Sequence, residues 1–152
     1  MGSITENGCG KAVFDVYISN THHTNPLTLS VTHSDFCTSV NGSGFYSVDC
    51  SGQYVYFVSQ YGITICGFDF WDEYNLIDLE KDAPAIVRTD ADSGQDSTVL
   101  MVGHPVGYSF DSDAGRDVSA FTTSSSAGHY VTIEFTNEYT ISRVVFMTEC
   151  TN

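Results

Sequence analysis

Positive charge is scarce in this sequence. Its 152 residues include 5 lysines and arginines against 19 aspartates and glutamates, which gives a formal net charge of −14 and a pI near 4.2. Binding to nucleic acid requires many basic side chains to neutralise phosphates, so the composition excludes that class of partner. An anionic membrane surface would repel the chain for the same reason. The remaining partners are neutral, cationic, or reached through a bound metal ion.

Long apolar segments and common enzyme motifs are also missing. No run approaches the roughly 20 apolar residues that a membrane-spanning helix needs. The sequence contains no C-x-x-C, G-x-S-x-G, G-x-G-x-x-G or G-x-x-x-x-G-K-[ST]. The start Met1-Gly2-Ser3 lacks the apolar core of a signal peptide. We interpret it as a remnant in place of a cleaved signal, with a true cytosolic start as the alternative.

The apolar content is nevertheless that of a folded protein. Hydrophobic residues make up 41% of the chain and aromatic residues 13%. A chain of this length buries a sizeable core without help from metals or many crosslinks. We therefore expect a single domain over residues 1–152, with residues 1–10 as an N-terminal extension.

Alternation of apolar and polar residues dominates the chain and predicts an all-β fold. The predicted strands are 13–19, 27–31, 53–59, 63–68, 99–102, 129–135 and 141–147. Helical spacing occurs only over Asp72–Asp82, where Pro84 would end the helix. This pattern predicts an antiparallel β-sandwich with at most one or two short helices, and a barrel is the alternative.

The cysteines indicate an oxidising compartment. Five are present, and Cys66 lies in an apolar run where an unpaired thiol would be buried. Cys37 and Cys50 flank a loop of glycine and serine that a disulfide would close, and Cys9 and Cys150 would then join the two termini. The other two connectivities of these four cysteines stay open. Disulfides favour a secreted protein.

Two aspartate-rich loops predict calcium binding. They share the pattern D-x-D-x-G-x-D and offer as ligands Asp90, Asp92, Asp96, Asp111, Asp113 and Asp117. Calcium prefers several oxygen ligands around a turn, although neither loop has the glutamate that closes an EF-hand. The alternative is that these residues simply form soluble turns.

The segment 68–75 combines aromatic and acidic side chains around the only tryptophan, Trp71. A sugar stacks its C–H face on a ring while a carboxylate accepts hydrogen bonds from its hydroxyls, so the pattern favours a carbohydrate site. The alternative is a core tryptophan among solvated acids. A glycoside hydrolase would need two of the available acids at a defined separation, and no spacing selects a pair among Asp69, Asp72, Glu73, Glu134 and Glu138.

Histidines offer a second metal hypothesis. His22, His23 and His33 lie near Asp35 in the sequence, and zinc or copper would require them to converge. The interpretation that the sequence favours for His22-His23 is a polar turn.

The middle of the chain resembles the actinoporin-like superfamily, nearer its fungal fruit-body lectin branch. The residues that carry the resemblance are Ser51-Gly52, the strand 54–59, Gly62, the strand ending at Gly67, the turn 69–75, Leu79, Asp82, 85–87 and 115–117. The resemblance implies a β-sandwich without catalysis that holds galactose or N-acetyl sugars by a Ser-Gly turn and an aromatic loop. The residues implied as ligand-binding are Ser51, Gly52, Asp69, Trp71 and Tyr74.

The resulting prediction is a non-enzymatic secreted module that binds a glycan or a glycosylated cell surface and is stabilised by calcium. Cytolysins of the same superfamily insert an N-terminal amphipathic helix, and Met1–Lys11 has almost no apolar face, so membrane insertion is disfavoured. One alternative is a secreted effector or adhesion protein that binds a protein partner, because an acidic surface attracts a cationic partner at long range. The other is a small glycoside hydrolase using an Asp/Glu pair.

Overall fold

A computed structural model describes residues 13–60, 64–65, 67–77, 85–89, 121–122 and 128–147. This part of the chain is all-β and antiparallel, as predicted, and none of its helices is long and apolar enough to cross a membrane. Its elements are β1 (Val13–Ser19), η1 (Pro26–Thr28), β2 (Phe36–Asn41), β3 (Gly44–Ser59), β4 (Thr64–Ile65), β5 (Gly67–Trp71), β6 (Leu76–Ile77), β7 (Ala85–Thr89), β8 (Phe121–Thr122) and β9 (His129–Met147).

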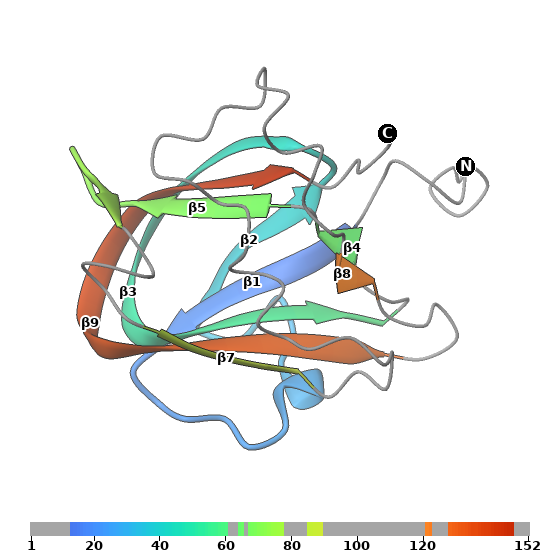
Figure 1. The fold of residues 1–152 in the computed structure, drawn as a ribbon. Coiled ribbons are helices and arrows are strands. Elements are labelled where there is room, and N and C mark those ends of the chain that lie inside the picture. The colour runs from blue at the N-terminus through green and yellow to red at the C-terminus, as the bar shows by residue number, and fades with distance from the viewer. Residues whose placement is uncertain are drawn as a thin grey trace.

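One sheet of seven strands makes both layers of the sandwich. Its order is β2-β1-β3-β9-β5-β6, with β7 also paired to β9, while β4 and β8 form a separate pair. The long strands β3 and β9 run antiparallel along their whole length and turn back together, so that each belongs to both layers (Figure 1).

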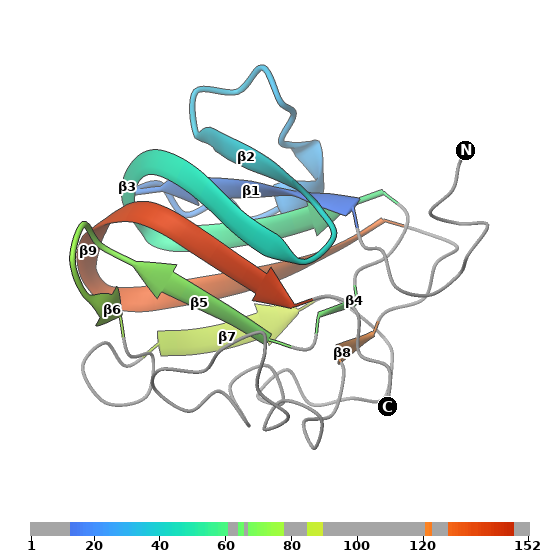
Figure 2. The same cartoon turned by 90° about the horizontal axis from the view of Figure 1, so that it is seen from above.

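The register assigns each neighbour to one layer. The first layer contains β2, β1, residues 54–59 of β3, residues 129–135 of β9, and β7. The second contains the first half of β3, the second half of β9, β5 and β6. Figure 2 shows the curvature of β3 and β9 that joins them.

The bend depends on Gly52. The register of β3 against β9 shifts between Ser47 and Cys50 and again between Gly52 and Tyr54. A Cβ at Gly52 would lie 2.5 Å from backbone atoms of Ser19, so only glycine lets the bend meet the end of β1. Beside it, the Gln53 side chain donates a hydrogen bond to the Phe135 carbonyl at 3.0 Å, which satisfies a backbone acceptor at the irregularity.

Phenylalanine rings fill the space between the layers. Phe14 and Phe57 of the first layer each lie 5.1 Å, centroid to centroid, from Phe146 of the second. Phe57 also meets Phe68 edge-on at 5.4 Å. Edge-to-face contacts of this kind are favourable beyond the area that they bury. The side chains alternate along each strand, so the residues between these phenylalanines point to the outer faces.

A second apolar cluster lies on the outer face of the first layer. It consists of Tyr17, Leu29, Tyr56 and Val58. The segment 20–35, which includes η1, covers it. Tyr56 fixes this segment because its hydroxyl accepts the His23 backbone N–H at 2.8 Å and donates to the Thr21 carbonyl at 3.1 Å.

The predicted strands are partly confirmed. Residues 13–19 form β1 as predicted, 53–59 form the second half of β3, and 129–135 and 141–147 are two halves of one bent strand. The prediction for 27–31 is wrong: Pro26 begins a 3-10 turn closed by the Leu29 N–H to the Pro26 carbonyl at 3.0 Å. The predicted strand 99–102 lies outside the described residues.

The predicted helix over Asp72–Asp82 is wrong in its described part. Residues 72–75 form a tight turn between β5 and β6, and Trp71 pairs with Leu76. The Asp72 carboxylate accepts the backbone N–H groups of Tyr74 and Asn75 at 2.8 and 2.7 Å. Aspartate favours such turns over a helix interior because its side chain bonds its own backbone two residues on.

The Cys37–Cys50 disulfide is present as predicted and joins β2 to β3. Both sulfurs belong to side chains that pack against the main core. The other proposed pair, Cys9 and Cys150, and the unpaired Cys66 lie outside the described residues.

Gly52→Ala should destabilise the fold. The added methyl group meets backbone rather than a movable side chain, and overpacking of this kind costs about 1–3 kcal/mol or more. Gly128→Ala is the matched control, because its nearest neighbour at 3.1 Å is the end of the Gln60 side chain. Chemical denaturation should show a clearly larger loss for Gly52→Ala. Equal stability of Gly52→Ala and the unchanged protein would contradict this account of the bend.

Removing the disulfide should also weaken the fold. Its cysteines are separated by 13 positions, and closing a loop of that size contributes about 3 kcal/mol. The double variant Cys37→Ala/Cys50→Ala should therefore unfold at lower denaturant concentration. An unchanged midpoint would mean that the pair does not constrain the unfolded chain.

Candidate functional site

The outer face of the second layer carries most of the predicted sugar-binding residues. Phe68 and Phe70 of β5 point into the core, so Asp69 and Trp71 point outward. The register places two rows of outward residues across β3, β9 and β5: Phe45, Val145 and Asp69 in one, and Ser47, Arg143 and Trp71 in the next. We call this surface the β5 face.

Arg143 organises the aromatic part of the β5 face. Its guanidinium carbon lies 4.7 Å from the Trp71 ring centroid and 5.8 Å from that of Phe45. A guanidinium over these rings is attracted by their negative π faces. The Nε atom of Arg143 is buried and has no hydrogen-bond partner within the described part of the chain.

Two aromatic side chains of the second layer are exposed. Phe45 is 67% exposed and Tyr74, at the tip of the β5–β6 turn, is 80% exposed. Exposed aromatic rings beside a guanidinium are typical of recognition surfaces.

Asp69 is the buried acid of the β5 face. Burial raises the pKa of its carboxyl to about 6, because a low-dielectric environment penalises the charged form. A carboxyl group whose charged form is destabilised by burial is a candidate for function.

Ser51 and Gly52 lie within a strand. They do not form a turn but belong to β3, opposite Thr140 and Tyr139 of β9 at the bend. The Ser51 hydroxyl is 3.0 Å from that of Thr140. Gly52 has the packing role described above, and ligand binding by Ser51 stays a prediction.

The acids considered for glycoside hydrolysis lie in different surroundings, and hydrolysis by a pair of them stays a prediction. Asp72 is occupied by the turn, and its backbone hydrogen bonds lower its pKa. Glu134 lies on the outer face of the first layer, between the inward-pointing Ile133 and Phe135, and so on the opposite side of the sandwich from Asp69. Glu73 and Glu138 are exposed.

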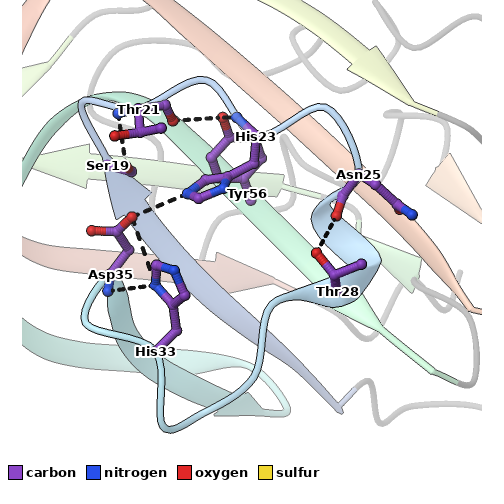
Figure 3. A network of polar contacts seen from close by, with 8 residues as sticks. All are labelled: Ser19, Thr21, His23, Asn25, Thr28, His33, Asp35 and Tyr56. Carbon is purple, nitrogen blue, oxygen red and sulfur yellow. Dashed lines mark hydrogen bonds and ion pairs between the residues drawn. The ribbon is translucent and has the colours of Figure 1, made fainter.

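A second constellation lies on the segment 20–35. The ligand atoms of His23, His33 and Asp35 all lie within 4.8 Å of one another. His23 Nε2 is 3.1 Å and His33 Nδ1 is 3.7 Å from the same Asp35 carboxylate oxygen, which lies between the two rings (Figure 3). His22, which the sequence also suggested, packs against Tyr54 instead, with its ring centroid 5.3 Å away.

Several contacts hold the His23–His33–Asp35 cluster in place. The Asp35 carbonyl accepts the Ile18 N–H of β1 at 3.1 Å, and the Asp35 N–H donates to His33 Nδ1 at 3.0 Å. The His23 ring lies edge-on to His33 and to Tyr56, at 5.3 and 5.4 Å. Burial is the largest single influence on the Asp35 carboxyl and raises its pKa. Hydrogen bonds from Ser19 and His23, together with the nearby imidazoles, outweigh it, so the pKa is lowered.

Sequence reasoning missed Arg143 and Phe45. A signal was present for Arg143: it is a basic residue inside a strand pattern of a strongly acidic chain. Its position opposite Trp71 depends on the register between β9 and β5, which the sequence does not encode locally. The six aspartates proposed as calcium ligands lie outside the described residues, so calcium binding stays a prediction.

Comparison with known proteins gives no match: no family model, no curated protein and no solved structure matches the chain.

Asp69→Asn should stabilise the protein at neutral pH. The protonated carboxyl is favoured in the fold, so its contribution is complete below the unfolded pKa near 3.9 and is lost as the pH rises through about 6. The gain at pH 7 is at most about 3 kcal/mol, from a shift of about two pKa units.

The gain from Asp69→Asn should vanish near pH 3.5. Asp72→Asn is the matched control with the opposite sign, because the folded state favours its charged form. Urea unfolding over this pH range measures both. A stability difference for Asp69→Asn that does not change with pH would contradict burial as the cause.

Proposed function

We propose that this protein is a non-enzymatic recognition module that binds a carbohydrate on the β5 face. The observation that carries the proposal is the pairing of the Arg143–Trp71 stack with the largely buried Asp69 one row away on the same face.

The chemistry of the β5 face suits a sugar. A pyranose ring offers apolar C–H groups on one face and hydroxyls around its edge. The exposed rings of Phe45 and Tyr74 supply apolar contact, and Trp71 supplies a further aromatic surface beside them. The Asp69 carboxyl accepts hydrogen bonds from hydroxyls when ionised, and Arg143 donates to hydroxyl oxygens.

The charge of the chain favours a neutral ligand. With a formal net charge of −14, the protein repels acidic partners at long range. A neutral glycan pays no such penalty, and its hydroxyls match the mixed donor and acceptor character of Arg143 and Asp69.

We place the protein outside the cell. The Cys37–Cys50 disulfide is compatible with an oxidising compartment, where glycans on cell surfaces are the available ligands.

Trp71→Ala should weaken carbohydrate binding at least about 30-fold, since a buried aromatic anchor of an interface contributes about 2 kcal/mol or more. The measurement is a glycan array, read with and without calcium, followed by titration of the best ligand. Tyr54→Ala removes an aromatic ring from the opposite outer face and should leave affinity unchanged.

Arg143→Gln extends the experiment because it keeps much of the side-chain volume and removes the charge. It should also weaken binding. Equal affinity of the unchanged protein, Trp71→Ala and Arg143→Gln would reject the β5 face as the site. Absence of any glycan signal, together with capture of a purified cationic protein, would favour the effector or adhesion alternative instead.

A further inference from the structure

We infer that His23, His33 and Asp35 form a binding site for a divalent transition-metal ion, of the kind that zinc occupies. This site is independent of the β5 face, because it lies on the segment that covers the outer face of the first layer.

The distances suit a metal with short bonds. Zinc binds imidazole nitrogen and carboxylate oxygen at about 2.0–2.2 Å, so two ligand atoms in a tetrahedral site lie about 3.4 Å apart. The separations here are 3.1 Å from His23 to Asp35 and 3.7 Å from His33 to Asp35, with all three ligand atoms within 4.8 Å. A closure of at most about 1.4 Å would bring the third pair to the ideal value.

The donor set selects the class of metal. Two imidazoles and one carboxylate suit zinc, copper, nickel or iron, whereas calcium and magnesium prefer oxygen ligands alone. Three protein ligands leave at least one coordination position to water or to a small ligand, which is the arrangement of an open rather than a closed structural zinc site.

The ligands are held before a metal arrives. Asp35 is tied to β1 by its carbonyl, and His23 is tied to Tyr56 of β3 by its backbone N–H. Neither anchor uses the side chain of His23 or Asp35, so both persist when these side chains bind an ion. Figure 3 shows Tyr56 beside His23, and the two rings facing the Asp35 carboxylate.

Binding would replace existing hydrogen bonds at modest cost. The ion takes the place of the His23–Asp35 hydrogen bond and, where His33 binds through Nδ1, of the bond from the Asp35 N–H. The side chains of His23, His33 and Asp35 are 19%, 37% and 25% exposed, so water can reach the groups that lose a partner. Backbone N–H groups that reach water carry little penalty.

The alternative explanation is that the cluster only anchors the segment 20–35. An anchoring network needs hydrogen bonds, and His23–Asp35 would suffice. The Asp35 N–H to His33 Nδ1 hydrogen bond would also hold the second imidazole in such a network. The metal site is distinguished from it by the convergence of three ligand atoms within 4.8 Å of one another.

Calorimetric titration of the chelator-treated full chain with ZnCl₂ tests the inference. We expect the unchanged protein to bind one zinc ion per chain. In the double variant His23→Gln/His33→Gln the affinity for zinc should fall more than about 100-fold, since changes to outer-shell groups alone cost 10–100-fold. Glutamine keeps hydrogen-bonding capacity, and the melting temperature of the metal-free variant verifies folding. His22→Gln is the matched control and should bind zinc as the unchanged protein does.

Four results would overturn the inference. The first is no zinc binding to the unchanged protein at millimolar concentration. The second is equal affinity in the double variant, which would assign zinc to cysteines or aspartates elsewhere. The third is an equal loss in His22→Gln, which would indicate adventitious binding by surface histidines. Calcium in excess should not displace the zinc, and displacement would contradict the nitrogen-rich site.

Discussion

The structure depends on one close backbone approach, that of Gly52 to Ser19. Gly52 has no side chain, and a Cβ there would collide with the Ser19 backbone. Glycine therefore lets β3 pass from one layer to the other where it meets the end of β1. The bend lets a single sheet supply both layers and brings Phe14 and Phe57 against Phe146. It also sends residues on either side of the bend to opposite outer faces. Each outer face therefore acquires its own surface chemistry from the same two long strands.

The two outer faces differ in what covers them. On the first layer, Tyr56 and its apolar neighbours are covered by the segment 20–35, which the tyrosine hydroxyl fixes through backbone bonds. That anchoring gives His23 and Asp35 defined positions. On the second layer, the register brings a guanidinium between aromatic rings and buries an aspartate beside them. The first arrangement offers nitrogen and oxygen ligands, and the second offers apolar surface with a donor and an acceptor. The proposed metal and sugar sites follow from this difference.

The sequence predicts strands well where alternation is local, as in β1, and poorly where tertiary contacts decide. Residues 129–147 look like two strands because the exposed polar residues at the bend interrupt the alternation, yet they form one. The helix predicted from Asp72 is wrong in its described part because the Asp72 carboxylate accepts backbone N–H groups of the next residues and forms a turn. The spacing of apolar residues carries no information about that interaction. Local composition points to Trp71, whereas the place of Arg143 opposite Trp71 is a matter of strand register. The histidines were noticed, but their convergence depends on the anchor at Tyr56.

The most direct test uses the protein's only tryptophan, because Trp71 reports on the β5 face alone. The measurement is its intrinsic fluorescence during titration with a neutral glycan that the protein binds, and in a separate titration with zinc. A sugar stacked at this face changes the surroundings of the indole, so the account predicts a saturable shift in emission with the glycan and none with zinc, whose proposed site lies on the opposite outer face. Emission that stays constant while the glycan saturates the protein would place the ligand elsewhere and contradict the central claim.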